Sequence, residues 1–186
     1  MKDLKGTKTE KNLLDAFSGE SQARNKYTYF AKAAEKEGYH YIAKIFIETA
    51  ENERQHAKDE FKLLNGIGNT KDNLLSAIEG ENYETNEMYP EFAKTAKAEG
   101  NIKAEILFNQ IAKVEAHHEA RYKKLLKMLE DGSVFKRENP INWKCSKCGY
   151  IHKGTEPPGK CPSCNHPKEY YEPECLCFNE ECDKCF

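Results

Sequence analysis

Apolar residues in the long cysteine-free part of the chain follow the spacing of amphipathic helices. One such stripe passes through Leu13, Phe17 and Tyr27, with charged residues between them. A capping-box pattern begins at Thr7, and a glycine stands at the end of each segment. We expect four helices, with Pro90 kinking the third, over residues 7–37, 39–65, 72–99 and 101–131.

The second half of this helical region repeats the first half at an offset of 62 residues. Phe30-Ala31-Lys32 returns as Phe92-Ala93-Lys94, and Glu37-Gly38 returns as Glu99-Gly100. The repeat predicts two related helical hairpins that face each other around a pseudo-twofold axis.

Each copy of the repeat carries a Glu-x-x-His motif, formed by Glu53 with His56 and by Glu115 with His118. Residues three apart share one face of a helix, so each motif directs a carboxylate and an imidazole to a common point. Two such helices suit a pair of iron or manganese ions. Ferritin-like di-iron bundles have this pattern, and each of their other two helices adds a Glu.

The first and third helices are expected to supply the remaining carboxylates. Glu20 lies on the inward stripe, where a charge is costly unless it is paired or bound to metal. The third helix offers Glu81, Glu84 and Glu87 along one face, where the acids would repel one another without a cation. Because the strict repeat partner of Glu20 is Asn82, the repeat does not choose among these three.

Three further residues have weaker claims to a role. His117 lies about 100° around the helix from His118, so we interpret it as a surface or supporting residue. His40 stands at a helix start and receives no role. Tyr27 lies two turns from Glu20 on the same face, either as a core tyrosine or as a hydrogen-bond donor to bound oxygen.

All eight cysteines lie between Cys145 and Cys185. Two CxxC pairs form a four-thiolate site for iron or zinc, and spacing alone does not separate the two metals. Gly149 and Asn165 follow the pairs, and both residue types tolerate the positive φ that turns backbone N–H groups toward sulfur. The expected ligands are Cys145, Cys148, Cys161 and Cys164.

The cysteines and the linker divide the chain. We expect a helical domain over residues 1–131, a linker over 132–142, a small metal module over 143–172 and a cysteine-rich tail over 173–186. The tail could bind zinc, iron or a cluster, form reversible disulfides, or be a disordered end. Its cysteines are Cys175, Cys177, Cys182 and Cys185.

Composition and charge limit the partners. A hydrophobic fraction of 38% and a charged fraction of 32% suit helices with a narrow apolar stripe. A net charge of −2 without a block of like charge gives no support for nucleic acid or membrane as a partner. The N-terminus lacks the apolar core of a signal peptide, so we expect a cytoplasmic protein. There, CxxC pairs bind metal or act in redox chemistry more often than they form structural disulfides.

These motifs together make the chain similar to the rubrerythrin family over roughly residues 3–172. The resemblance implies an all-α, four-helix ferritin-like di-iron bundle followed by a rubredoxin-like domain. Besides the paired CxxC knuckles, it rests on Gly19-Glu20-Ser21-Gln22-Ala23-Arg24-Asn25, Glu53-Arg54-Gln55-His56-Ala57, Glu84-Thr85-Asn86-Glu87-Met88-Tyr89-Pro90 and Glu115-Ala116-His117-His118-Glu119.

The resemblance also implies a ligand set. Glu53 and Glu115 would bridge two irons. One iron would add Glu20 and, depending on oxidation state, His56 or Glu87. The other would add Glu84 and His118, which leaves Glu81 outside the set.

The activity implied by the resemblance is that of a non-haem di-iron peroxidase in oxidative-stress defence. It would reduce hydrogen peroxide to water with electrons relayed through the four-cysteine iron, supplied by a rubredoxin or an NAD(P)H-dependent reductase. The alternatives are a ferroxidase or oxygen reductase, and an iron-handling ferritin relative. The attached cysteine module argues against storage. A zinc-ribbon binding protein is disfavoured by the charge balance and the metal-binding helices.

The connection between the second and third helices is short for this fold. These helices run parallel in a ferritin-like bundle, and the distance to be crossed is roughly 36 Å at 1.5 Å per residue. Residues 66–71 span at most about 25 Å. We therefore predict a domain-swapped homodimer in which the first two helices of one chain pair with the last two of another.

Overall fold

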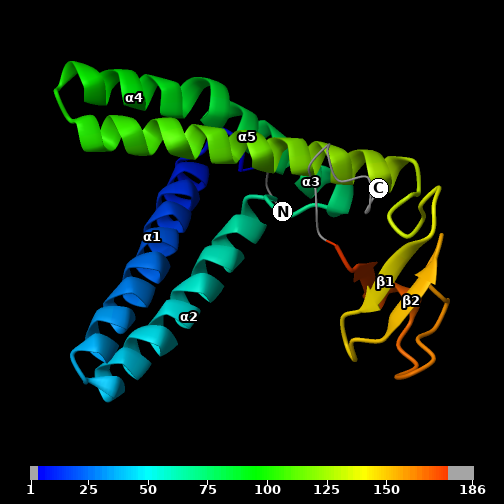
Figure 1. Ribbon diagram of the computed structural model, residues 1–186. Coiled ribbons are helices and arrows are strands. Elements are labelled where there is room, and N and C mark those ends of the chain that lie inside the picture. Colours follow the sequence, from blue (N-terminus) through cyan, green and yellow to red (C-terminus); the bar gives the residue numbers. More distant parts are fainter. Residues whose placement is uncertain (1–3, 176–186) are drawn as a thin grey trace. The chain divides into compact units, whose positions relative to one another are not determined.

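The computed structural model describes residues 4–175 and divides into two compact units after Asn69 (Figure 1). The first unit is a helical hairpin. The second unit contains the remaining helices and a small β module. Along residues 4–175, no helix combines the length and the apolar character needed to cross a membrane.

The first unit consists of α1 (Lys8–Lys36) and α2 (His40–Leu63). The predicted capping box is formed in part: the Glu10 amide donates to Thr7 Oγ1 over 3.1 Å, but the Glu10 carboxylate accepts from the Gly6 amide over 2.6 Å and not from the Thr7 amide. Gly38 ends α1 with a φ of 84°, a conformation that glycine adopts without strain. Small side chains let the two helices approach closely, and the buried ones are Ala31, Ala34, Ala43, Ala50 and Ala57.

The helices of the second unit are α3 (Thr70–Tyr83), η1 (Glu84–Met88), α4 (Tyr89–Ala98) and α5 (Ile102–Glu130). The predicted third helix is therefore divided by η1, a single π-helical turn. Pro90 is the second residue of α4, which follows η1 without a break. A π turn accommodates one extra residue in a helix. The irregularity in the third segment is therefore this turn, whereas the sequence analysis expected a kink at Pro90.

Packing in the second unit repeats packing in the first at the 62-residue offset. Ala93 and Ala96 are buried as Ala31 and Ala34 are. Each hairpin, taken by itself, also leaves large apolar side chains exposed at matching positions. The exposed fraction is 47% for Phe30 and 44% for Phe92, and 43% for Ile45 and 56% for Leu107.

The β module is a three-stranded antiparallel sheet in the order β2-β1-β3. Its strands are β1 (Ile141–Cys145), β2 (Ile151–Gly154) and β3 (Tyr171–Pro173), and a short 3₁₀ turn, η2 (Lys168–Tyr170), precedes β3. Trp143 is completely buried, and its indole N–H donates to the Gly154 carbonyl over 3.0 Å. The core around it consists of Ile141, Cys145, Cys161 and Tyr171.

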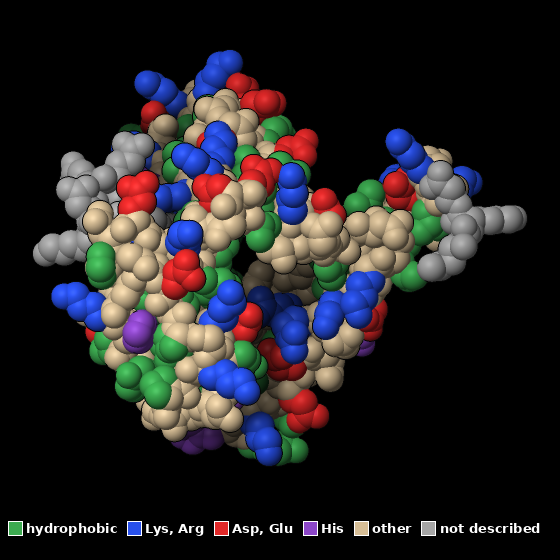
Figure 2. Space-filling model, turned by 90° about the vertical axis from the view of Figure 1, so that its right-hand side faces the viewer, with side chains coloured by type: hydrophobic (Ala, Val, Ile, Leu, Met, Phe, Trp, Pro, Cys, Tyr) green, Lys and Arg blue, Asp and Glu red, His purple; other side chains and the backbone are tan. Residues whose placement is uncertain are grey.

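Charged side chains of both signs are interspersed over the face seen in Figure 2. This distribution agrees with the net charge of −2, and no field of one sign dominates the view.

Candidate metal centres

The hairpin of α1 and α2 brings together the first predicted group of ligands. His56 Nδ1 lies 2.9 Å from Glu53 Oε2 and 3.7 Å from Glu20 Oε1. One potential ligand atom from each of the three residues lies within 4.8 Å of the others. The two carboxylates are partly buried, whereas the His56 side chain is 58% exposed.

The second unit builds a matching group from α3 and α5. His118 Nδ1 lies 2.6 Å from Glu115 Oε2 and 3.5 Å from Glu81 Oε2. These three residues also offer ligand atoms within 4.8 Å of one another. Each unit thus contains one triad of two carboxylates and one imidazole.

The second triad contains Glu81, which the expected ligand set had left out. Glu84 is half-buried and Glu87 is exposed, and neither belongs to the triad. The geometry adds Glu81 to the candidate ligands, one turn N-terminal to Glu84. Which of the three acids binds iron stays a prediction, and Glu81 now has the geometric support.

The π turn η1 explains the difference. Tyr27 and Tyr89 are related by the 62-residue offset, but Glu20 and Glu81 are 61 residues apart. A single residue taken up in η1 accounts for the change, because a π turn inserts one residue without ending the helix. Glu81, rather than Asn82, is therefore the structural counterpart of Glu20.

Crowded acids in both triads raise carboxyl pKa values. Burial raises the pKa of Glu20, the hydrogen bond and negative charge of Glu53 raise it further, and His56 opposes the shift. Burial likewise raises the pKa of Glu81, His118 opposes the rise, and Glu115 reinforces it. A bound cation would offset the repulsion between the carboxylates of each pair.

The donor set of the triads fits iron. Carboxylate oxygen and imidazole nitrogen are ligands for divalent first-row metals, and carboxylates accept either oxidation state of iron. His117 and His40 are exposed and lie outside both triads.

Two tyrosines lie close to the triads in sequence and share one packing pattern. The Tyr27 ring lies 6.2 Å from Phe30 and 6.1 Å from Phe46. Tyr89 repeats this packing with Phe92 and Phe108, at 6.3 and 6.1 Å. Burial raises the pKa of Tyr89, and the charges of Glu84, Glu115 and Glu81 add to the rise. Sequence reasoning missed Tyr89, although its 62-residue offset from Tyr27 was a usable signal.

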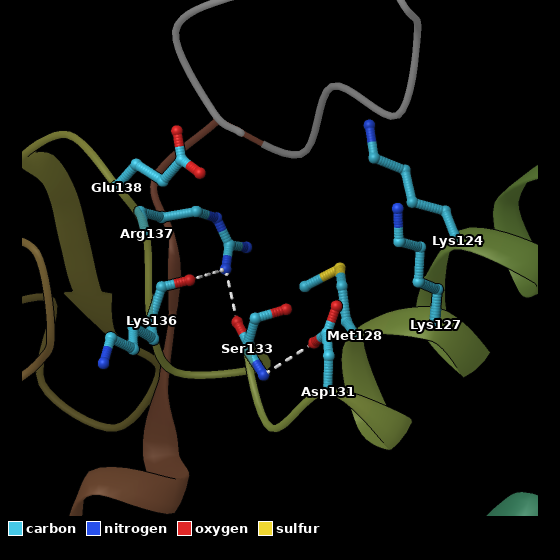
Figure 3. A pocket seen from close by; sticks show the side chains of 8 residues that line it. All are labelled: Lys124, Lys127, Met128, Asp131, Ser133, Lys136, Arg137 and Glu138. Carbon is cyan, nitrogen blue, oxygen red and sulfur yellow. Dashed lines mark hydrogen bonds between the residues drawn. The ribbon is translucent and has the colours of Figure 1, made fainter.

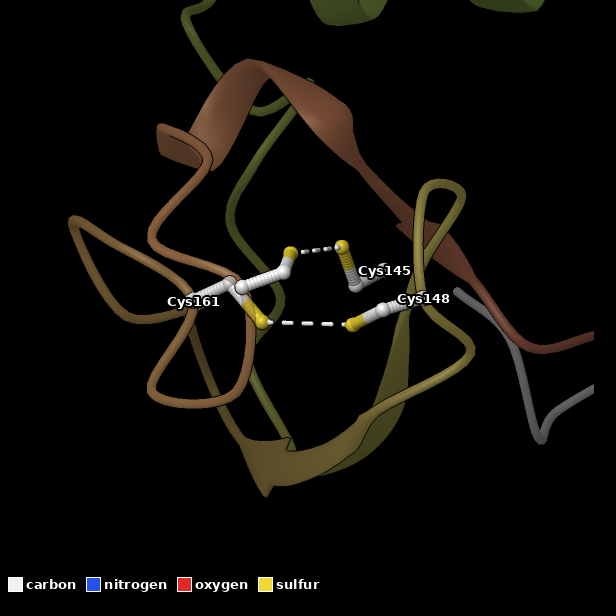
Figure 4. Close-up of side chains that lie close together, drawn as sticks. Cys145, Cys148 and Cys161 are labelled. Atoms are coloured by element: carbon white, nitrogen blue, oxygen red, sulfur yellow. Dashed lines mark hydrogen bonds between the residues drawn. The ribbon is translucent and has the colours of Figure 1, made fainter.

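The β module brings the four predicted cysteines together (Figure 4). Cys145 Sγ lies 3.7 Å from Cys164 Sγ, and Cys148 Sγ lies 3.7 Å from Cys161 Sγ. Four thiolates around a tetrahedral metal at about 2.3 Å would be about 3.8 Å apart, so these spacings fit such an ion.

The turns beside the cysteine pairs have the predicted backbone. Gly149 has a φ of 79° and Asn165 has a φ of 60°, which confirms the expected positive values. Sequence reasoning did not single out His166, whose Nδ1 lies 3.3 Å from Cys164 Sγ. Of the tail cysteines, Cys175 is described, while Cys177, Cys182 and Cys185 lie outside the described residues.

A concave surface of about 430 Å³ lies where the linker leaves α5. Figure 3 shows Lys124 and Lys127 on the helix side and Arg137 on the linker side. The Arg137 guanidinium is buried and donates to the Ser133 and Lys136 carbonyls over 2.7 and 2.6 Å. No residue of the metal clusters lines this surface, so it is separate from the chemistry described above.

The fold and the sites together define a class of protein. A ferritin-like helical domain with two carboxylate–histidine triads, joined to a rubredoxin-like four-cysteine module, is the architecture of an iron-dependent oxidoreductase.

Comparison with known proteins identifies the family. The family profile "Rubrerythrin" matches residues 11–126, and "Rubrerythrin, rubredoxin-like domain" matches residues 143–172. The chain is 51% identical to a rubrerythrin of Porphyromonas gingivalis over 92% of each chain. It is 50% identical to rubrerythrin-1 of Clostridium acetobutylicum, over 92% of this chain and 97% of that one. A rubrerythrin of Nitratidesulfovibrio vulgaris is 45% identical with the same coverage.

Among solved structures, nigerythrin in a partially reduced state gives a TM-score of 0.36 at 36% sequence identity. That match covers 89% of this chain and 86% of the other chain.

The chain belongs to the rubrerythrin family. Its cofactors are a di-iron centre held by carboxylates and histidines and one iron in the four-cysteine module.

Proposed function

We propose that this protein is a cytoplasmic peroxidase that reduces hydrogen peroxide to water in defence against oxidative stress. The observation that carries the proposal is the presence of both kinds of centre in one chain. The triads provide for two irons, and the cysteine module adds a one-electron carrier. A storage protein needs no attached electron carrier, which disfavours iron handling as the main role.

When bound, the two helical irons supply the two electrons that cleave one peroxide into two waters, and the four-cysteine iron restores them one at a time. The electrons would come from a rubredoxin or an NAD(P)H-dependent reductase. Two protons must also reach the peroxide oxygens. Burial and the neighbouring carboxylates raise the pKa values of Glu20 and Glu81, which favours these side chains as carriers of those protons.

The side chains divide the remaining work. Glu53 and Glu115 are the deepest carboxylates of their triads, with side chains 16% and 14% exposed, and in our proposal they would help to hold both irons. Glu20 and Glu81 would each complete the ligands of one iron. Glu84 and Glu87 lie in η1, where a wide turn leaves a carboxylate free to change its position. Tyr27 and Tyr89, which are related by the 62-residue repeat, would each donate a hydrogen bond to bound oxygen.

We further propose that the two triads meet across a domain-swapped homodimer. Helix α2 continues ten residues past Glu53, and α3 starts eleven residues before Glu81, a combined rise of roughly 32 Å. The six residues between Leu63 and Thr70 reach at most about 25 Å. Because the segment between Leu63 and Thr70 is too short to cross the bundle, the four-helix bundle would be completed by the helices of a second chain.

The apolar faces of the separate hairpins support this assembly. Matching residues such as Ile45 and Leu107 are exposed when each hairpin is taken by itself. A ferritin-like bundle would cover both, since its two hairpins face each other. Exposed apolar patches of this kind are typical of surfaces that bind a partner.

The activity is tested by reducing the iron-loaded protein without air and adding stoichiometric hydrogen peroxide or oxygen in separate reactions. Oxidation of the helical and four-cysteine irons is followed by their separate absorption bands. We expect peroxide to oxidise both centres at least about tenfold faster than oxygen does. Faster reaction with oxygen would instead identify an oxygen reductase or ferroxidase.

A further inference from the structure

Two concave surfaces adjoin each other where the linker leaves α5. The basic surface is the one of about 430 Å³ in Figure 3, with Lys124 and Lys127 on the helix and Lys136 on the linker. The apolar groove beside it has a volume of about 250 Å³. Met128 and Arg137 line both, so the two surfaces are continuous. The side chains that make the groove apolar include Leu125, Met128, Val134, Phe135 and Pro173.

Hydrogen bonds of the linker hold the walls of both surfaces. The Ser133 amide donates to the Met128 carbonyl over 2.9 Å at the end of α5. The Arg137 amide donates to the Thr155 carbonyl of the β module over 2.8 Å, and its guanidinium lies 5.3 Å from the centre of the Trp143 ring. The linker is therefore bonded both to the helix and to the module.

The last described residues lead the chain into the apolar groove. The Glu174 amide donates to the Asn142 carbonyl over 2.9 Å, and the Asn142 side chain donates to the Glu174 carboxylate over 2.8 Å. These bonds fix position 174 against β1. Cys175 follows, is half-buried and lines the groove. The chain continues with residues 176–186, which reach about 36 Å when extended, well beyond the span of concavities this small.

The order of residue types in this tail matches the order of the two surfaces. The residues nearest Cys175 include the apolar Leu176 and Phe178, which suit the apolar groove. The acidic Glu180 and Glu181 come next, and their charge suits the lysines of the basic surface. A tail that starts in the groove would meet the two surfaces in this order.

We propose that the apolar groove and the basic surface together form a docking site for the chain's own tail, residues 176–186. Phe178 is the apolar anchor in the groove, and Glu180 and Glu181 face the lysines of the basic surface. The docked tail adds contacts between α5 and the β module to those that the linker makes.

Attachment at the edge of the site favours the chain's own tail over a segment of a second copy. A short flexible tether gives an effective concentration of about a millimolar, which a separate molecule would have to match. Exposed ion pairs are individually weak and are screened by salt. The apolar contacts therefore provide most of the affinity, while the lysines select the acidic end of the tail.

The test places the photoreactive p-benzoylphenylalanine at position 178 of the full-length, iron-loaded protein. After irradiation, a denaturing gel separates adducts within one chain from adducts between chains, and mass spectrometry of peptides locates the bond. We expect an adduct within one chain at the apolar groove, with Met128 as the main site because C–H groups beside sulfur react readily with this reagent.

Charge reversal tests the basic surface. Lys124→Glu combined with Lys127→Glu should lower the yield of this adduct about fivefold, since each exposed pair contributes only modestly. The matched control is Lys103→Glu combined with Lys113→Glu, which makes the same change of charge on α5 outside both surfaces. It should leave the yield unchanged.

Adducts between chains, adducts spread over the protein, or a yield that ignores charge reversal would each overturn the proposal. If the photoreactive residue prevents folding, chymotrypsin cleavage after the native Phe178 provides a second test. Cleavage there should be about fivefold faster in the charge-reversed variant than in the native protein, because it follows the undocked fraction. Equal rates would overturn the proposal. Neither measurement involves turnover, so the result is independent of the peroxidase proposal.

Discussion

Glu20 and Glu81 occupy equivalent places in the two triads, although the strict 62-residue repeat does not pair them. Both complete a triad, and burial and a neighbouring carboxylate raise the pKa of each. A repeat applied strictly assigns Asn82 as the partner of Glu20, and an amide is a weaker ligand than a carboxylate. A shift of one residue in the alignment of the two repeats thus decides whether Glu81 or Asn82 is the counterpart of Glu20.

Substituting the three acids of the third helix one at a time tests this assignment. Glu81→Ala should lower the iron affinity of the helical site at least about 100-fold, since even residues that only support a ligand are worth 10- to 100-fold. Glu87→Ala is the matched control on an exposed position and should retain metal. Iron per chain after anaerobic loading is the measurement. Retention of both irons by Glu81→Ala with loss in Glu84→Ala would restore the ligand set implied by the family resemblance.

Most of the residues in the two triads could be predicted from the sequence. Spacing alone brought Glu53, His56, Glu115 and His118 to the right faces, because i and i+3 neighbours depend only on the helix itself. It did not place Glu81 beside Glu115 and His118, because a π turn leaves no compositional mark. His166 escaped because its contact with Cys164 depends on how the turns pack.

The element that decides the register is η1. The four predicted segments agree with the helices to within a few residues, since capping residues and glycines mark the ends clearly. Only the interior of the third segment differs. The π turn carries Glu84 and Glu87 immediately after α3, so the most irregular part of the helical region bears two of the three candidate acids.

Deletion of Asn86, an exposed residue of η1, should convert the π turn into ordinary helix. Because the repeat then becomes strict, Glu81 should keep its place relative to Tyr89 and the triad should still bind iron. Glu84 and Glu87 would change their direction, and we expect peroxide turnover to fall at least about tenfold while iron content persists. Circular dichroism and the helical iron absorption check the fold and the site.

A loss of iron in the deletion variant would contradict this account, because it would mean that the extra residue itself places Glu81. Asn86→Ala is the control for the side chain, whose amide donates to the Asn82 carbonyl over 3.0 Å. It should leave both iron content and turnover near native values.

At the scale of the whole molecule, each unit offers one triad among the residues that the structure describes. In the proposed di-iron centre, one hairpin of each kind would contribute, whether both come from one chain or from two. The short connection between Leu63 and Thr70 favours two chains, and this question can be answered without a further structure.

Mixed dimers distinguish the two arrangements. One chain carries Glu53→Ala with His56→Ala, and the other carries Glu115→Ala with His118→Ala; two affinity tags isolate the mixed pair. In a swapped dimer, one site receives both intact halves and the other receives both damaged halves. We expect about half of the native di-iron content and activity. Each variant alone should give neither, and a mixed dimer without a working site would exclude the swap.

The alanines buried between α1 and α2 have a kinetic consequence. Each buries only a single methyl group, so closing the hairpin gives little hydrophobic stabilisation. The larger apolar side chains of the hairpin stay exposed until they contact another surface. If that surface belongs to a second molecule, the step that completes folding is an encounter between chains. Refolding would then accelerate with protein concentration, and the cell's supply of newly made chains would set how fast working centres form.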